Sequence, residues 1–230
     1  MRHEFGKTII IALGGSVIFP EKIDIKFLKE FRALIMSQIN RHKRRFIIVT
    51  GGGRICRVYQ QAAKRVVRVA DEDTDWLGIH TTRCNAHLLR TIFRKDANPI
   101  VFDKRHRIKG LKYPITIASG WRPGNSTDYI AVRLACDFKV SEIVILGKPK
   151  YVYDKDPDKY KGANPIQDMS WKECRKLVPE KWVPGANSPV DPIAARIGEE
   201  RNVNALVLGK NLKNLKNLLE GRDFQGTLIS

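Results

Sequence analysis

The fold is decided by one stretch, residues 46–57, with the sequence FIIVTGGGRICR. Its first four residues are apolar and mostly β-branched, which is typical of a buried strand. Three glycines end the strand, and a helical pattern follows with Arg54 and Arg57 in its first turn. Glycine permits positive φ and close approach of a ligand, and the free N–H groups of a helix start attract anions. By itself the stretch fits a phosphate site and a structural turn without a ligand equally well.

The first apolar run of the chain ends in the same way. Residues 8–13 are followed by Gly14, Gly15 and Ser16, and Asp24 can cap the helix behind them. Two successive units of strand, glycine turn and helix predict a β-α-β arrangement with a parallel sheet. Further strands are expected at 99–102, 114–117, 142–146, 205–208 and 226–229, with a long loop over 151–168. Further helices are expected from Asp73 or Thr74 to Phe93, over 129–136 and 171–178, from Pro192, and over 212–219.

The length of 230 residues predicts one domain or two intimate lobes. The chain has no run of 18 apolar residues and no signal-peptide pattern, so we expect no membrane span and a cytoplasmic location. The cysteines are widely spaced, match no zinc or redox motif, and are expected to be buried thiols within helices. They are Cys56, Cys84, Cys136 and Cys174.

The chain is strongly basic, because 42 lysines and arginines against 24 acidic residues give 42 − 24 = +18. Such a charge suits a polyanionic ligand, from a nucleotide to a nucleic acid. Basic clusters lie at 41–45 and 104–112, but no zinc-finger spacing or aromatic RNA-binding pattern accompanies them. We therefore expect most of these residues to form a solvated surface, and we do not expect a nucleic-acid partner.

Three glycine-bearing turns, at 14–16, 51–53 and 120–127, follow predicted strands. In an open parallel sheet such turns gather at the carboxyl edge, where ligands bind. Three turns suited to phosphate on one edge indicate more than one phosphate group, and hence a donor and an acceptor. None of them matches the G-x-x-x-x-G-K-[ST] motif, which argues against a P-loop enzyme.

Six short motifs follow one another along nearly the whole chain. They are IALGGSV at 11–17, VTGGGR at 49–54, DWLGI at 75–79 with TRCNA at 82–86, PGNSTD at 123–128, VYDKDP at 152–157, and DPIAA at 191–195. In this order and spacing they resemble the amino-acid-kinase superfamily, and within it the archaeal type of uridylate (UMP) kinase. The resemblance implies an α/β fold, a three-layer α/β/α sandwich with a mostly parallel central sheet. It implies a single domain over 1–230, in which about 1–140 holds the acceptor nucleotide and about 141–230 holds ATP.

The resemblance also implies a reaction, the transfer of the γ-phosphoryl group of ATP to UMP with Mg²⁺, giving UDP. This chemistry depends on in-line positioning and charge neutralisation more than on a nucleophilic side chain. The residues implied to bind UMP are Gly52, Asp75, Trp121, Arg122, Pro123, Gly124, Asn125, Ser126 and Thr127. Those implied to bind ATP are Gly14, Gly15, Ser16, Gly53, Arg57, Gly147, Tyr153 and Asp156. Catalytic roles fall to Asp128 and Arg196, and the metal has no assigned side-chain ligand.

Structural roles stay open for four of these residues. Asp75 also fits a charge at a helix start, and Asp128 fits a carboxylate in the first turn of a helix. Tyr153 also fits a core aromatic, and Asp156 before Pro157 fits a turn.

Three places depart from the pattern of the family. The family's lysine before the first glycine pair is replaced by Ala12 in this chain, and its lysine after Asp-Pro-x-Ala-Ala is replaced by Arg196. The family's Thr-Asn-Val-Asp-Gly segment is replaced by GKPKY at 147–151. The last change alters part of the implied ATP pocket, although bacterial uridylate kinases also place a lysine at the position of Lys148.

Two alternative hypotheses are a same-fold kinase with another phosphate acceptor, such as isopentenyl phosphate, and a non-catalytic nucleotide- or oxyanion-binding relative. The resemblance further implies a homo-oligomer, a hexamer built from dimers.

Overall fold

The computed structural model of the chain describes residues 1–179 and 189–230. Within these residues the central sheet has seven strands in the order β3-β2-β1-β4-β8-β9-β7. The strands are β1 (Thr8–Leu13), β2 (Arg45–Thr50), β3 (Ile115–Ala118), β4 (Glu142–Gly147), β7 (Asp168–Met169), β8 (Asn204–Gly209) and β9 (Thr227–Ile229). Only the pairing of β8 with β9 is antiparallel, so the sheet is mostly parallel, as expected.

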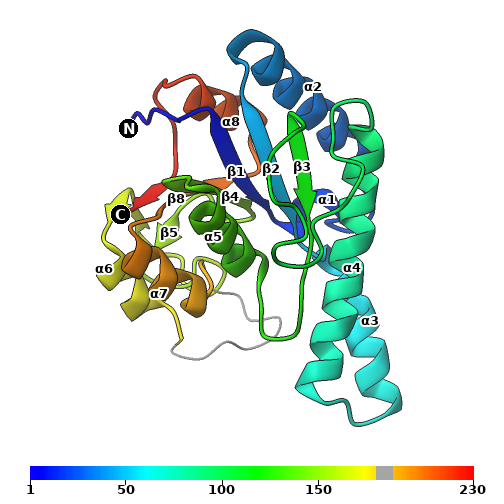
Figure 1. Cartoon of the computed structure of the whole chain (residues 1–230). Coiled ribbons are helices and arrows are strands. Elements are labelled where there is room, and N and C mark those ends of the chain that lie inside the picture. Colours follow the sequence, from blue (N-terminus) through cyan, green and yellow to red (C-terminus); the bar gives the residue numbers. More distant parts are fainter. Residues whose placement is uncertain (180–188) are drawn as a thin grey trace.

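Helices cover both faces of the sheet and complete a three-layer α/β/α sandwich (Figure 1). One face packs on α5 (Thr127–Phe138), α6 (Trp171–Leu177) and α7 (Pro192–Arg201). The other packs on α1 (Gly15–Ile18), α2 (Ile25–His42), α4 (Asp71–Ile92) and α8 (Leu212–Leu219). Strands covered on both sides must be apolar throughout, which is why β1 and β2 are continuous apolar runs rather than alternating ones.

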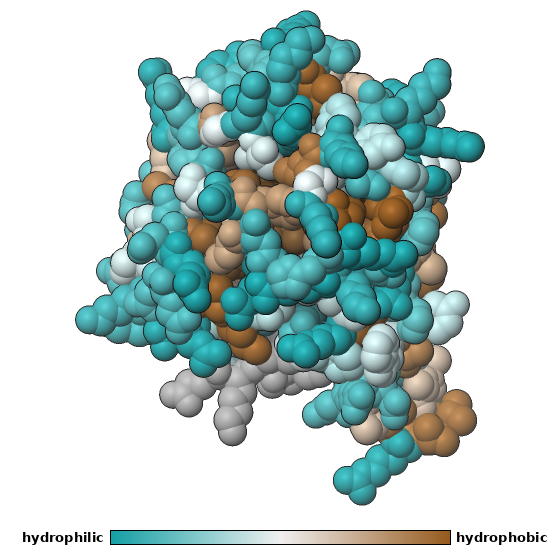
Figure 2. All heavy atoms as spheres, in the orientation of Figure 1, coloured by the Kyte–Doolittle hydropathy of each residue, from teal (hydrophilic) through white to brown (hydrophobic). Residues whose placement is uncertain are grey.

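One helical hairpin projects away from the sandwich. It consists of α3 (Gly53–Val66) and the N-terminal part of α4, and it extends beyond the sheet in Figure 1. No residue of α3 is buried, and apolar residues gather at the end of the hairpin in Figure 2, where Val66 is 81% exposed. Helices of a monomer normally bury an apolar stripe, so this hairpin has an unusually open apolar surface.

Several predicted boundaries were wrong for local reasons. The long helix begins at Asp71 with Ala70 as its N-cap, so neither Asp73 nor Thr74 caps it. Residues 99–102 form no strand; only a bridge between Phe102 and Ala118 forms there, because Pro99 has no N–H to donate. The predicted loop over 151–168 contains the short antiparallel pair β5 (Val152–Tyr153) and β6 (Pro165–Ile166) and the start of β7.

The cysteines were predicted to be buried, and this is wrong for Cys84, which is exposed on α4. Cys174 is buried, whereas Cys56 and Cys136 are half-buried, and all four are free thiols in helices. Among the described residues, no helix combines the length and the apolar content needed to span a bilayer.

Candidate active site

The glycine turns at 14–16 and 51–53 pack against each other through their backbones at the carboxyl edge of the sheet. A Cβ on Gly15 would lie 2.0 Å from the nitrogen of Gly53, and one on Gly51 would lie 2.4 Å from the nitrogen of Gly15. Gly53 also has a φ of +76°, which side chains rarely adopt. These glycines are therefore required by the contact between the turns, independently of any ligand, and the contact brings the starts of α1 and α3 together.

A cavity of about 200 Å³ opens beside this contact. Eight of the predicted nucleotide-binding residues line it: Gly52, Gly53, Arg57, Asp75, Arg122, Asn125, Ser126 and Thr127. Seven further residues line it that were not among the individually predicted binding residues: Gly51 and Gly120, which belong to the predicted glycine turns, and Cys56, Gln60, Gly78, Ile79 and Thr82. Cys56 and Gln60 lie one and two helical turns beyond the glycines on the face of α3 that carries Arg57 and Gly53, so helical spacing could have indicated them.

Asp75 connects α4 to the turn at 120–127. The backbone N–H of Gly124, whose φ is +79°, donates to Oδ2 of Asp75 at 2.7 Å. Asp75 follows the first turn of α4, where Asp71, Glu72 and Asp73 lie, so its alternative role as a helix-start charge is wrong. The carboxylate is half-buried in the wall of the cavity, where it can accept hydrogen bonds from a ligand hydroxyl.

The motif at 82–86 holds two of the three turns in place, those at 51–53 and 120–127. The Asn85 side chain donates to the carbonyl oxygens of Gly51 at 2.7 Å and Gly52 at 3.3 Å. The hydroxyl of Thr82 accepts from the N–H of Gly120 at 2.8 Å. These bonds satisfy buried backbone groups of two turns from one helix, so α4 fixes the shape of the cavity.

Two acidic residues lie behind the cavity, at the starts of α5 and α7. The N–H of Asp191 donates to Oδ2 of Asp128 at 3.3 Å, and Oδ1 of Asp191 accepts from the N–H of Ala194 at 2.7 Å as the helix N-cap. Burial, reinforced by the negative charge of Asp191, raises the pKa of Asp128 to about 7. Burial also raises the pKa of Asp191, whose Oδ2 is buried without a hydrogen-bond partner among the described residues.

Three residues of the predicted UMP turn are not in the wall of this cavity. Trp121 is a core residue: its Nε1 donates to the carbonyl oxygen of Phe102 at 3.1 Å, and its ring stacks on Phe102 with 5.9 Å between centroids. Pro123 and Gly124 form the turn itself without lining the cavity. The structure thus gives the side chain of Trp121 a packing role.

Arg196, predicted to be catalytic, lies apart from Asp128. It is exposed, approaches Glu200 at 3.9 Å, and lines a separate cavity of about 500 Å³ beside α6 and α7. Arg196 follows Asp191 by five residues on α7, so the two side chains leave the helix on different sides. The described geometry therefore does not unite the two predicted catalytic residues.

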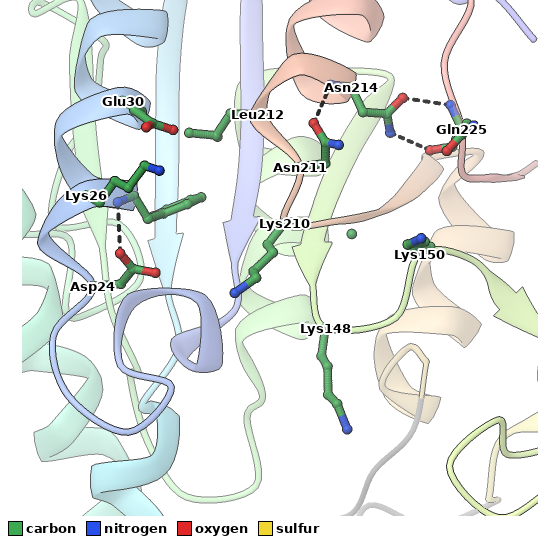
Figure 3. Close-up of a pocket in the computed structure, with 12 residues that line it drawn as sticks. Asp24, Lys26, Glu30, Lys148, Lys150, Lys210, Asn211, Leu212, Asn214 and Gln225 are labelled. Atoms are coloured by element: carbon green, nitrogen blue, oxygen red, sulfur yellow. Dashed lines mark hydrogen bonds between the residues drawn. The ribbon is translucent and has the colours of Figure 1, made fainter.

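A larger cavity of about 510 Å³ lies at the carboxyl ends of β4 and β8 (Figure 3). Its basic residues include Lys148 and Lys150, from the segment that departs from the family pattern, and Lys210, which follows β8. The side chain of Lys150 packs on Gly209: a Cβ added to Gly209 would lie 3.1 Å from Cγ of Lys150. Lys148 is held by Asp158, with 2.6 Å between Nζ and Oδ2.

The remaining predicted ATP residues surround the strand ends rather than line this cavity. Gly147 ends β4 in register with Gly209, and the N–H of Gly14 donates to the carbonyl oxygen of Leu146 at 2.8 Å. Ser16 lies in α1, directly after the first glycine pair. Tyr153 is half-buried on β5 with its ring edge-on to Tyr151, and Asp156 is exposed in the turn that follows.

The model of the amino acid kinase family matches residues 7–209. The chain belongs to the amino acid kinase family. Among family members, the uridylate kinase of Thermococcus sibiricus is 32% identical over 96% of this chain and 98% of its own length. The uridylate kinase of Methanocaldococcus jannaschii is 33% identical over the same shares. The solved uridylate kinase of Archaeoglobus fulgidus superposes with a TM-score of 0.83, at 26% identity, over 98% of this chain and 100% of that one.

Proposed function

We propose that this chain is a UMP kinase, which transfers the γ-phosphoryl group of ATP to UMP and releases UDP. The observation that carries the proposal is the cavity where the glycine turn at 51–53, Asp75 and the turn at 122–127 meet, in a chain similar to uridylate kinases along nearly its whole length. These residues come from three separate segments, and the motifs that supply them are among those that led to the family.

The acceptor nucleotide would occupy the 200 Å³ cavity. Its phosphate would be bound by N–H groups of the turn at 51–53 and by the guanidinium of Arg122, which lines the cavity. Arg57, which the family resemblance assigns to ATP, lines the same cavity and would lie between the acceptor phosphate and the phosphates of ATP. Asp75 would accept hydrogen bonds from the ribose hydroxyls. The fixed Gly124 contact orients this carboxylate before the nucleotide arrives, which reduces the ordering cost of binding.

The donor ATP would occupy the larger cavity. Its lining comes from the 141–230 part of the chain, except for one wall that α2 and its N-cap form. Lys148 and Lys150 would replace polar residues that the family segment carries, and together with Lys210 they would supply positive charge near the strand ends. Replacing both Lys150 and Lys210 by alanine is expected to raise KM for ATP at least tenfold while changing KM for UMP less than threefold. Equal effects on both substrates would contradict this placement.

Mg²⁺ would enter with ATP. The ion would be bound mainly by substrate phosphates and water, as Mg²⁺ commonly is in phosphoryl-transfer sites. The bound ion would neutralise charge on the phosphates. Asp128, anchored to the start of α7 by the N–H of Asp191, would orient the groups around the transfer.

The chain would also form a homo-oligomer built from dimers, as the family resemblance implies. The exposed apolar residues Val58, Tyr59, Val66 and Val67 support a dimer through α3, because a second copy would cover a surface that a monomer leaves in water. Light scattering on the wild type and on V58E/V66E would test this, with a shift to monomer expected.

A coupled assay of ADP release, with UMP, CMP and isopentenyl phosphate as acceptors, tests the activity. Turnover fastest with UMP is expected. Turnover fastest with isopentenyl phosphate would favour the kinase with another acceptor. UMP binding without turnover of any acceptor would favour the non-catalytic relative.

A further inference from the structure

A basic surface lies at the amino edge of the sheet, opposite the edge that carries the cavities. It contains six exposed cations that we call the amino-edge cluster: Lys7, Arg41, Lys43, Arg45, Lys95 and Lys112. Strands of six residues are about 17 Å long, so this surface is separate from the nucleotide site. None of the roles proposed above uses it.

The sheet brings residues distant in sequence into one row. The N–H of Arg45 donates to the carbonyl oxygen of Lys7 at 2.8 Å, and the N–H of Phe46 donates to that of Pro114, two residues after Lys112, at 2.8 Å. The N–H of Ile115 donates to the carbonyl oxygen of Asp96, next to Lys95, at 3.1 Å. Neighbouring strands lie about 4.8 Å apart, so four adjacent segments present cations over roughly 14 Å. Hydrophilic side chains cover this upper edge in Figure 2.

The six cations have no partners within the described residues, where no ion pair or side-chain hydrogen bond involves them. The nearby carboxylates pair with other cations or are buried. Glu220 pairs with Arg222, Asp223 approaches Arg2 at 3.5 Å, and Glu142 is buried. Glu4 is exposed and Asp96 is half-buried, so the acidic charge at this edge falls short of the basic charge. Unpaired like charges on neighbouring strands are unfavourable, and a bound anion would relieve this repulsion.

The dipoles of the helices explain only part of the cluster. Arg41 and Lys43 lie at the C-terminus of α2, and Lys95 follows α4, where cations are favourable in any protein. Lys7 and Arg45 instead stand at the starts of β1 and β2, and Lys112 lies three residues before β3, where no comparable dipole acts. These three residues distinguish a binding surface from ordinary helix-end charge.

We propose that the amino-edge cluster binds single-stranded nucleic acid. A row of free cations along the edge fits a chain of phosphates, and Tyr113, 38% exposed and adjacent to Lys112, offers a ring on which a base can stack. An anionic membrane is the less favoured partner, because firm membrane attachment needs an inserted apolar face or a lipid anchor besides charge. Tyr113 is the only exposed large apolar side chain that the described residues place at the starts of β1, β2 and β3.

The test measures binding of a fluorescent 15-nucleotide single-stranded RNA by anisotropy at several salt concentrations, with excess UMP present to cover the acceptor cavity. Six phosphate contacts predict a log–log salt slope of about −4, or roughly a 16-fold loss of affinity on doubling the salt. The variant K7Q/R45Q/K112Q removes the three cations at or just before strand starts, and its slope should fall to about −2. The control K22Q/K29Q/K213Q removes the same charge from exposed, unpaired lysines before or near the starts of α2 and α8, which follow the carboxyl ends of strands, and should bind as the wild type does.

The outcomes separate the possibilities. Loss of binding in K7Q/R45Q/K112Q alone, with unchanged melting temperature and kinase turnover, supports the proposal. Equal losses in both triple variants would show a diffuse effect of net charge and overturn it. Absence of binding at low salt would also overturn it, as would binding to phosphatidylserine vesicles with RNA left unbound. Because turnover is measured separately, failure here leaves the proposed kinase activity untouched.

Discussion

The buried carboxyl group of Asp128 gives a quantitative prediction about the pH dependence of stability. Its pKa is raised from 3.8 to about 7 by burial and by the charge of Asp191. One pKa unit corresponds to about 1.4 kcal/mol, so the rise corresponds to at most about 4 kcal/mol. A pKa higher in the folded state stabilises the fold below pH 3.8, and this contribution is lost as pH rises through about 7.

The perturbation is Asp128→Asn, which keeps the shape of the protonated acid and the acceptor for the N–H of Asp191. Relative to wild type, the variant should become more stable as pH rises from 4 to 8, by up to about 4 kcal/mol. Urea unfolding of the ligand-free protein at a series of pH values measures this difference. The control Asp168→Asn, at an exposed carboxylate, should follow the wild type. Parallel curves for wild type and Asp128→Asn would refute the reasoning, since Asp128 would then ionise as an exposed carboxylate does.

Three further predictions concern residues around the site. Asp75→Ala should raise the dissociation constant of UMP by about 10- to 100-fold, because hydrogen bonds to a charged group are lost. The dissociation constant of ATP should rise less than threefold. Calorimetry that shows equal losses of affinity for both nucleotides would contradict the role assigned to Asp75. Gly15→Ala should destabilise the protein by about 3 kcal/mol or more, because a Cβ would lie 2.0 Å from the nitrogen of Gly53, whereas the control Gly6→Ala, with no atom within 4 Å, should melt as the wild type does. Trp121→Phe should lower the free energy of unfolding by about 1 kcal/mol, because the hydrogen bond from the indole to Phe102 is lost. The control Trp76→Phe, at a side chain 36% exposed on α4, should lower it less in the same thermal melt. An equal decrease in both variants would argue against a packing role for Trp121.

The parallel core and most of the acceptor cavity were predictable from sequence. Residues 9–13 and 46–49 are apolar on both faces, and this pattern is typical of strands covered on both sides. The glycine turns behind them had to gather at the carboxyl edge, because parallel strands end there together. Asp75 and the turn at 122–127 came from the family resemblance, and the structure places Asp75, Arg122 and residues 125–127 around one cavity.

Other features depended on contacts that no local pattern contains. Trp121 lies in a turn next to the cavity, yet the carbonyl oxygen of Phe102 draws its ring into the core. Arg196 follows a recognisable motif, but the rotation of α7 turns it toward another cavity. Asp128 and Asp191 are 63 residues apart, and only the packing of α5 beside α7 makes them neighbours with altered pKa values.

The sequence by itself therefore determined the layers, the glycine turns and the family, because short-range periodicity and motif spacing encode them. The tertiary structure decided which side chains face a cavity, which carboxylates share a buried environment, and where the excess positive charge gathers. From the sequence we expected solvated clusters at 41–45 and 104–112. Strand pairing instead joins Lys7 to Arg45 and Phe46 to Pro114, two residues after Lys112, because hydrogen bonds between strands join segments that lie far apart along the chain.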